Sequence, residues 1–230
     1  MSEIFVSILV ATKNRHKFLE NILRNFNRQD YPNELMELII ADDGDCLMEN
    51  DIPKDISNIK YLKYDKISLG LKRNKLCENA KGDIIVFMDD DDFYPKDKIS
   101  VYVNELSNNS DCLLAGSSIM HVFYTKLNKI YKFGPYGKNH CTCGTLAFKK
   151  EYFKNHKFPD LCKAEERIFL DSYKNKMIQI DSMKSILVIA HLENTVDKHK
   201  FLKYGKLTAL TLDDFNLTEL DKKFYLSLSN

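Results

Sequence analysis

Residues 84–92 read Ile84-Ile-Val-Phe-Met-Asp-Asp-Asp-Asp92, an apolar run that ends in four consecutive aspartates. A short, continuous apolar run of this kind is typical of a buried strand. Unpaired carboxylates are excluded from protein cores, so we expect the aspartates to lie where the strand ends and to face water, a cation or a ligand. Adjacent carboxylates repel one another unless positive charge is close. The cluster therefore predicts a divalent metal, and oxygen-only ligands favour Mg²⁺ or Mn²⁺.

Strands and helices alternate along the first half of the chain. We expect strands at residues 5–10, 38–41, 59–64 and 84–88, and helices at residues 15–29, 69–80 and 95–106. Gly82 is expected to close the helix 69–80 in the left-handed conformation. Such alternation predicts an α/β fold with a mainly parallel central sheet, flanked by helices and joined by right-handed crossovers.

The second half of the chain is less regular. We expect short strands, some of them antiparallel, at residues 112–115, 119–124, 127–133, 145–148, 177–180 and 186–190. A helix is expected at residues 164–173, and the tail is expected to be mostly helical. Because the sequence shows neither a linker nor a repeat, we predict one domain over residues 1–230.

The composition excludes several classes of protein. With 44% hydrophobic residues, the chain of 230 residues can bury a core. The net charge of +1 gives no overall attraction to nucleic acid or to an anionic membrane. The sequence has neither a signal peptide nor an apolar run of about 18 residues. We therefore expect a cytoplasmic protein with no transmembrane segment and no nucleic-acid partner. Peripheral membrane attachment and the oligomeric state are left open.

Three polar clusters follow the predicted strands. They are Lys13-Asn-Arg15, Asp42-Asp43-Gly44 and the four aspartates 89–92. In open α/β sheets, ligands bind at the carboxyl ends of the parallel strands. Since these ends meet at one edge of the sheet, the three clusters are expected to form one site.

These motifs occur together in a known order. Val6-Ser-Ile-Leu-Val-Ala-Thr-Lys-Asn-Arg15 is followed by Leu38-Ile-Ile-Ala-Asp-Asp-Gly44, Gly70-Leu-Lys-Arg-Asn74 and Gly82-Asp-Ile-Ile-Val-Phe-Met-Asp-Asp-Asp-Asp92. The series resembles the family 2 glycosyltransferases, which have the Rossmann-like GT-A fold. The resemblance is good over residues 4–107 and loose over residues 140–195. It implies a nucleotide-sugar-binding half at about residues 1–107 and an acceptor-binding half at about residues 108–230.

The resemblance also implies how the donor is bound. The expected donor-binding residues are Ala11, Thr12, Asn14, Arg15, Asp43, Lys72, Arg73 and Asp90. Asp43 would accept a hydrogen bond from a uracil-type base, and Ala11 would contact the nucleotide through its backbone. Arg73 would lie against the nucleotide, near Asp43 or the diphosphate. Cationic side chains form strong, charge-assisted hydrogen bonds with phosphate.

The aspartate cluster matches the DxD motif of this family at Asp89-x-Asp91. The resemblance implies that these two residues bind Mn²⁺ or Mg²⁺, with Asp91 as the main ligand. Asp90 and Asp92 would then be supporting or structural residues. His191, followed by Asn194, stands where some GT-A enzymes supply a ligand to the metal or the diphosphate. An ordinary structural role for His191 is the alternative.

The pair Glu165-Glu166 resembles the Glu-Asp pair that contains the general base of the family. This chain has Glu where Asp is usual, which leaves open which carboxylate acts; we favour Glu166. First-turn acids that stabilise the helix dipole are the alternative reading.

The predicted function is metal-dependent transfer of a sugar from a nucleoside-diphosphate sugar, with UDP favoured, to a hydroxyl of a glycan, lipid or protein. One-step attack would invert the anomeric centre, but retention stays open because the fold hosts both outcomes. Two alternatives are a sugar-phosphate nucleotidyltransferase and a non-catalytic binding module of the same fold. The former favours a glycine-rich loop after the first strand, where residues 11–15 contain no glycine.

Overall fold

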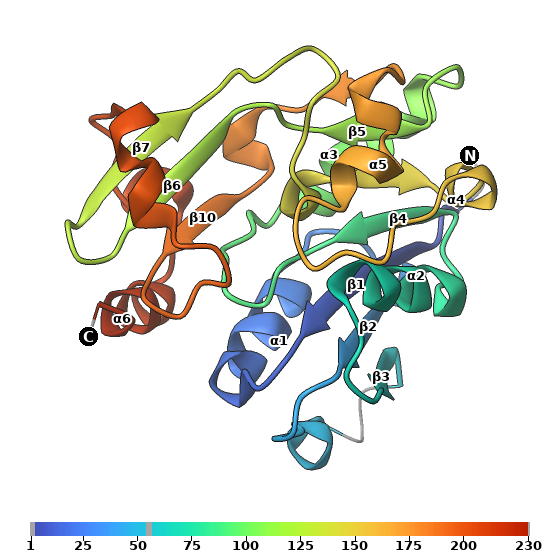
Figure 1. Ribbon diagram of the computed structural model, residues 1–230, viewed down its shortest axis with the longest axis horizontal. Coiled ribbons are helices and arrows are strands. Elements are labelled where there is room, and N and C mark those ends of the chain that lie inside the picture. Colours follow the sequence, from blue (N-terminus) through green and yellow to red (C-terminus); the bar gives the residue numbers. More distant parts are fainter. Residues whose placement is uncertain (1–2, 54–56, 230) are drawn as a thin grey trace.

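The main sheet has seven strands in the order β3-β2-β1-β4-β8-β5-β9 (Figure 1). The strands predicted for the first half of the chain form one side of this sheet, from β3 to β4. The computed structural model describes residues 3–53 and 57–229, so the predicted domain limits at residues 1 and 230 lie outside it. The strands of this sheet are β1 Val6–Thr12, β2 Met36–Asp42, β3 Ile59–Lys63, β4 Ile84–Phe87, β5 Leu114–Gly116, β8 Ala147–Lys149 and β9 Ile178–Gln179. Only β8 runs antiparallel to its neighbours β4 and β5. The prediction of a mainly parallel sheet with an antiparallel portion is confirmed.

A second sheet of four strands is built from the later part of the chain, in the order β10-β6-β7-β11. Its strands are β6 Met120–Tyr124, β7 Lys129–Phe133, β10 Leu187–Ala190 and β11 Lys206–Leu207. Because β5, β8 and β9 belong to the first sheet, both halves of the chain contribute to that sheet. The division at about residue 107 stays a prediction.

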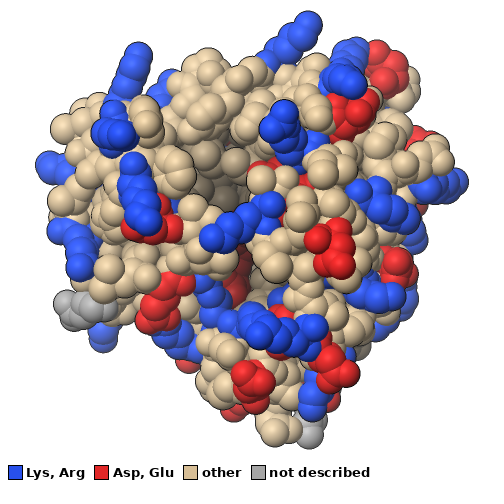
Figure 2. Space-filling model, in the orientation of Figure 1, with Lys and Arg blue, Asp and Glu red and all other residues tan. Residues whose placement is uncertain are grey.

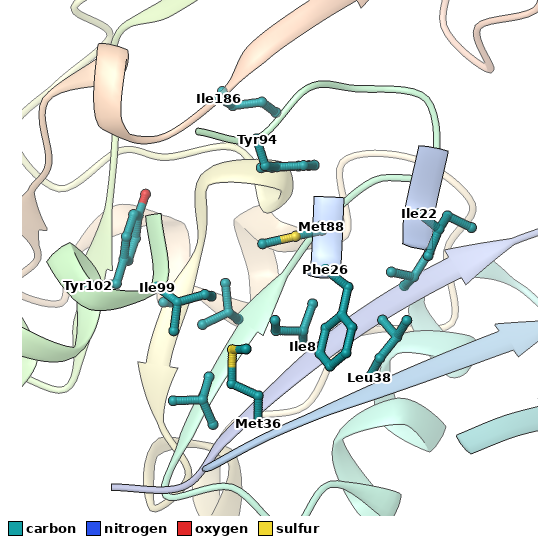
Figure 3. Close-up of a cluster of buried hydrophobic side chains, with 14 of the residues drawn as sticks. Ile8, Ile22, Phe26, Met36, Leu38, Met88, Tyr94, Ile99, Tyr102 and Ile186 are labelled. Carbon is teal, nitrogen blue, oxygen red and sulfur yellow. The ribbon is translucent and has the colours of Figure 1, made fainter. Parts of the chain in front are cut away.

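Helices cover both faces of the seven-stranded sheet. They are α1 Leu19–Asn27, α2 Leu69–Asn79, α3 Lys98–Asn108, α4 Tyr152–Asn155 and α5 Glu166–Phe169, while α6 Glu219–Ser227 packs on the second sheet. Neighbouring residues of a strand point to opposite faces. Ile8 accordingly packs with Ile22 and Phe26 of α1 (Figure 3). Leu9 packs in a separate cluster with Leu76 of α2. These two cores hold the carboxyl ends of β1, β2 and β4 at one edge.

Two helix predictions for the second half were wrong in extent. The helix expected at residues 164–173 is limited to α5, because Asp171, Ser172 and Tyr173 have left-handed backbone angles that interrupt it. The tail is helical in α6, but Lys198–Tyr204 is a 3₁₀ helix and β11 pairs with β7. In both segments tertiary contacts override the local helical preference.

Gly82 has a different role from the one predicted. Helix α2 ends at Asn79, and Ala80 is extended rather than left-handed. The backbone N–H of Gly82 donates to Ser7 Oγ over 2.8 Å. A Cβ atom at Gly82 would lie 2.4 Å from the backbone nitrogen of Ser7. The close approach of the chain to β1, not a helix stop, therefore requires glycine here.

Lys98 is fully buried in α3. Its ammonium group donates to the backbone oxygens of Gly144 at 2.9 Å and Ser185 at 3.3 Å. It also lies over the rings of Tyr94 and Tyr102. Burial lowers the pKa of Lys98 to about 7. An unfolded lysine keeps its proton to about pH 10.4, so folding releases a proton between these two values.

The unfolding free energy of Lys98→Met, relative to the wild type, is expected to fall as the pH rises above 7. In that range only the unfolded wild-type chain binds the lysine proton, so wild-type stability rises with pH by up to about 1.4 kcal/mol per unit. Methionine has a similar size and no charge, and it removes this dependence. Urea unfolding of both proteins below, near and above pH 7 measures the difference. A difference that is constant with pH would contradict the assignment.

No helix in the described part of the chain combines the length and the apolar character needed to cross a membrane.

Candidate active site

A cleft of about 470 Å³ opens at the carboxyl ends of β1, β2 and β4. In Figure 2 this face is hollowed near its centre, with acidic side chains in the hollow and basic side chains around it. The predicted site residues that line the cleft are Ala11, Thr12, Arg15, Asp43, Lys72, Arg73, Asp89, Asp90, Asp91, Glu165 and Glu166. The three polar clusters therefore converge as the sequence indicated.

Asp43 follows β2 and is almost fully enclosed by hydrogen-bond donors. Lys72 of α2 forms an ion pair with its Oδ1 and donates to the backbone oxygen of Thr12 over 2.6 Å. Lys13 and the backbone N–H of Ile67 donate to its Oδ2 over 3.2 and 3.1 Å. Burial by itself would raise the pKa of Asp43, but the hydrogen bond and charge of Lys72 hold that pKa below its ordinary value. The carboxylate is ionised and fixed in position.

The four aspartates differ sharply in exposure. Asp90, Asp91 and Asp92 are 4%, 6% and 2% exposed, whereas the Asp89 side chain is 42% exposed. Burial does not remove these three from the cavity walls: Asp90 and Asp91 line the cleft and Asp92 lines a second cavity. The expectation that the aspartates face a cation or a ligand stays a prediction. Protein groups solvate the buried carboxylates; the backbone N–H of Ile189, for example, donates to Asp92 over 2.7 Å. Asp92 ties the end of β4 to β10, as expected of a structural residue.

Arg15 supplies the positive charge that the aspartate cluster requires. Its guanidinium contacts Asp90 at 2.8 Å and Asp91 at 2.5 Å. The hydroxyl of Thr12 donates to Asp90 over 2.7 Å. Burial, together with the charge of Asp91, raises the pKa of Asp90 above its ordinary value. Arg15 thus links the end of β1 to the end of β4.

Asp91 has further partners from the segment after β10. His191 Nε2 lies 3.1 Å from Asp91 Oδ2, and the side-chain amide of Asn194 donates to the same oxygen over 3.1 Å. Burial would raise the pKa of Asp91, but the charges of Lys198 and Arg15 and the contact with His191 keep that pKa well below its ordinary value. Asp91 is therefore held as a carboxylate.

Arg73, the next residue of α2 after Lys72, contacts a different set of acids. It pairs with Glu165 and its guanidinium lies 3.8 Å from Asp89. The cations beside Asp43 are Lys72 and Lys13. Arg73 instead joins Glu165, at the start of α5, to Asp89, and its expected contact with the nucleotide or the diphosphate stays a prediction.

Glu165, the residue before α5, and Glu166, its first residue, have different surroundings. The Glu165 side chain is 2% exposed and its charge is paired with Arg73. Glu166 lines the cleft, and in the described structure its carboxylate has neither a hydrogen-bond donor nor an ion-pair partner from another side chain. Burial raises the pKa of Glu166 above its ordinary value. Glu166 is thus the carboxylate of the pair that can receive a proton from a bound molecule.

Two predicted residues lie outside the cleft wall. Asn14 has a left-handed backbone, and its Oδ1 accepts from the backbone N–H groups of Asp45 and Cys46 over 2.7 and 3.1 Å. It positions the turn after β2. His191 is buried behind Asp91 and packs against Phe18. The predicted donor and metal contacts of these two residues stay predictions.

Several segments of the cleft wall were not expected from the sequence, among them the loop at residues 142–144 and Lys198. A Cβ atom at Gly144 would lie 2.7 Å from Asp89 Oδ2, so glycine lets the Asp89 carboxylate lie against the loop at residues 142–144. No spacing in the sequence connects these segments with the aspartates. They come together through the second sheet.

A second cavity of about 230 Å³ adjoins the cleft and shares Asp89, Thr142 and Lys198 with it. Its other walls are mainly apolar or aromatic: Met120, Val122, Tyr124, Phe133, Tyr136, Ile186, Val188 and Phe201, with Asp92. The two cavities therefore meet at Asp89.

The donor atoms near Asp91 have the chemistry that a divalent cation requires. Carboxylate oxygens from Asp89 and Asp91 suit Mg²⁺ and Mn²⁺, and an imidazole nitrogen from His191 suits a transition metal. Among the residues that the structure describes, no three acidic, histidine or cysteine side chains are grouped as a metal site. Arg15 occupies the charge-compensating position beside Asp91.

Known proteins resemble this chain in sequence. The model of the family described as "Glycosyl transferase family 2" matches residues 7–157. An uncharacterized glycosyltransferase of Haemophilus influenzae is 26% identical over 222 residues, which is 90% of this chain and 82% of that protein. The poly(ribitol-phosphate) beta-N-acetylglucosaminyltransferase TarS of Staphylococcus aureus is 27% identical over 47% of this chain. That match spans 20% of TarS.

Solved structures show the same fold. The mannosyltransferase PcManGT of Pyrobaculum calidifontis, solved with GDP-Man and Mn²⁺, has a TM-score of 0.67 at 15% identity. The superposition covers 84% of this chain and 59% of the PcManGT chain. TarS residues 1–349 with UDP-GlcNAc has a TM-score of 0.64 at 16% identity, over 83% of this chain and 60% of that one. The chain thus has the GT-A fold and spans about three fifths of these two structures.

Proposed function

Because the chain belongs to glycosyl transferase family 2, we propose that it transfers a sugar from a nucleoside-diphosphate sugar, with UDP as the nucleotide, to an acceptor hydroxyl. One observation carries the proposal: Asp43, Asp89 and Glu166 all line the same cleft. These three carboxylates have separate surroundings and so can have separate tasks. TarS, solved with UDP-GlcNAc, supports a UDP-sugar as the donor.

The nucleotide is proposed to lie along Asp43 and the end of β1. Asp43 is held ionised by Lys72 and Lys13, and it retains lone-pair capacity for a donor from the base. Arg73 and Arg15 line the same cleft as Asp43 and contact the aspartates of the DxD motif, and the diphosphate is proposed to lie beside them. Guanidinium groups bind phosphate oxygens in a bidentate manner.

A divalent cation, Mn²⁺ or Mg²⁺, is proposed to be held by Asp91 and Asp89, with His191 as a further candidate. When bound, such a cation compensates the charge that develops on the departing diphosphate. The contact between Arg15 and Asp91 keeps this carboxylate ionised and oriented before the cation binds. The Mn²⁺ in the PcManGT structure supports this choice of ion.

Glu166 is proposed as the general base. It takes the proton of the acceptor hydroxyl while that oxygen forms a bond to the anomeric carbon. The bond from this carbon to the diphosphate oxygen breaks at the same time, and its electron pair leaves with the nucleotide. Attack opposite the leaving group inverts the anomeric centre. General-base catalysis of this kind contributes about 10²- to 10⁴-fold.

The acceptor is proposed to enter through the second cavity, which meets the donor cleft at Asp89. Its mainly apolar walls suit an acceptor that presents apolar surface next to the reacting hydroxyl, as sugar rings and lipids do. Glycan, lipid and protein hydroxyls all stay within the proposal.

The proposal can be tested by incubating the protein with a panel of nucleotide sugars, with and without Mn²⁺, and measuring the slow release of the nucleotide by hydrolysis. We expect metal-dependent release of UDP from one UDP-sugar and slower release from GDP-sugars. Hydrolysis that is absent for every donor would favour the non-catalytic binding module. Release of pyrophosphate from a nucleoside triphosphate and a sugar phosphate would instead establish a nucleotidyltransferase.

A further inference from the structure

Residues 198–208 read Lys198-His-Lys-Phe-Leu-Lys-Tyr-Gly-Lys-Leu-Thr208, a stretch with four lysines and no acidic residue. We call these residues the basic strap. The strap begins as a 3₁₀ helix, Lys198–Tyr204, and continues into β11 at the edge of the second sheet. A 3₁₀ helix has three residues per turn, so residues three apart lie above one another. A lysine followed by an apolar residue occurs three times at this spacing, twice within the 3₁₀ helix and once in β11.

The apolar members of the repeat are exposed to solvent. Phe201, Tyr204 and Leu207 are 48%, 69% and 59% exposed. The residues between the repeats face the protein: Leu202 packs on the core, and Gly205 lies against an aromatic ring of β7. The strap is thus anchored on one side and presents large apolar side chains on the other. Clustered exposed apolar residues of this kind mark interaction sites.

The lysines of the repeat, Lys200, Lys203 and Lys206, are exposed beside the apolar residues. Lys206 stands directly opposite Lys132 in the antiparallel pairing of β11 with β7. Two lysines directly opposite each other on neighbouring strands repel, which destabilises the pairing unless an anion lies nearby. Within the described residues, no carboxylate oxygen lies within 4.0 Å of the ammonium groups of Lys203, Lys206 or Lys132. Lys200 has a weak counter-charge in Asp197, at 3.9 Å. The other three lysines lack one in this part of the chain and are complementary to an anionic partner.

We propose that the basic strap binds the surface of a membrane that contains anionic phospholipids. Tyr204 and Leu207 would enter the interface between headgroups and acyl chains, and the lysines would contact the headgroups. Lysines alternating with aromatic and aliphatic residues are the pattern of interfacial segments. Figures 1 and 2 show the strap beside β6 and β7 and several basic side chains on that side of the molecule.

The basic strap lies next to the second cavity, so a membrane bound at the strap would lie close to the proposed acceptor entrance. Phe201 belongs to the strap and also lines the second cavity, which meets the cleft at Asp89. A membrane bound at the strap would therefore lie at the mouth of that cavity. A soluble polyanion would use the lysines but would leave Tyr204 and Leu207 exposed to water. The combination of both residue types favours a lipid surface.

Co-sedimentation of the full chain with vesicles tests the proposal without any assay of catalysis. The vesicles contain phosphatidylcholine alone or phosphatidylcholine mixed with phosphatidylglycerol. We expect binding to the mixed vesicles that weakens as salt is added, and little binding to the neutral ones. Each lysine at an anionic surface strengthens binding about fivefold. Lys203→Glu combined with Lys206→Glu should therefore weaken binding by at least about 25-fold.

Tyr204→Ser combined with Leu207→Ser should weaken binding while leaving its salt dependence unchanged. The control is Lys60→Glu with Lys63→Glu, which makes the same charge change on β3, the far edge strand of the first sheet. Circular dichroism confirms that each variant is folded. Equal binding to both kinds of vesicle, or equal losses in the control and the strap variants, would overturn the proposal. A loss confined to the lysine variant would indicate a soluble polyanion instead, and would also overturn it.

Discussion

Replacing Glu166 with glutamine is expected to lower kcat by about 10²- to 10⁴-fold, with little change in the affinity for UDP. Glutamine has the same shape but cannot accept the acceptor's proton. Glu166 lines the cleft without a partner from another side chain in the described structure, so the substitution leaves no buried charge unpaired. Initial rates with a saturating donor measure the loss, and calorimetric titration with UDP measures donor affinity.

Glu165→Gln separates the base from its neighbour. This variant leaves Arg73 without its carboxylate partner, so we expect weaker donor binding and reduced stability. Glu219→Gln, on the exposed first turn of α6, is the neutral control. The assignment of the base would be wrong if Glu165→Gln abolished kcat while Glu166→Gln retained it.

The pH dependence follows from the same residue. The base must be ionised in the free enzyme, and burial raises the pKa of Glu166 above its ordinary value. The value of kcat/KM should therefore fall as the pH decreases through this raised pKa. The same decrease should be absent from the residual activity of Glu166→Gln.

Replacing Asp91 with asparagine is expected to remove the gain in UDP affinity that Mn²⁺ provides and to lower activity by at least about 100-fold. Asparagine keeps the size of the side chain, whereas alanine would leave Arg15 and His191 without their partner. Titration with UDP, with and without Mn²⁺, measures the effect. Equal UDP affinity under both conditions in the wild type would contradict the metal proposal itself.

The other aspartates provide a matched series for this experiment. Asp89→Asn should reduce activity strongly, because Asp89 faces both cavities. Asp92→Ala should act mainly on folding: it leaves the backbone N–H of Ile189 unsatisfied, at a cost of about 1–3 kcal/mol. Asp90→Asn keeps an acceptor for Thr12 and should be the mildest. The ranking fails if Asp90→Asn is the worst variant and Asp91→Asn is mild.

The sequence by itself determined the parallel strands of the first half, their order along the chain and the residue types at their ends. An apolar run such as residues 84–88 can be buried only as a regular element, and parallel strands joined by helices bring their carboxyl ends to one edge. The convergence of Asp43 with the aspartates at 89–92 was therefore predictable. The resemblance to the family also drew attention to the pair at residues 165–166, which lines the same cleft; the catalytic role of this pair stays a prediction.

Only the tertiary structure decided how each charge is compensated. Adjacent residues of a helix point in different directions, so local spacing could not tell that Lys72 pairs with Asp43 while Arg73 pairs with Glu165. Likewise, the burial of Asp91 depends on Arg15 and on the segment after β10, a hundred residues away in the chain. Charges are compensated by proximity in space, and long-range proximity is set by packing of the two sheets rather than by spacing in the sequence.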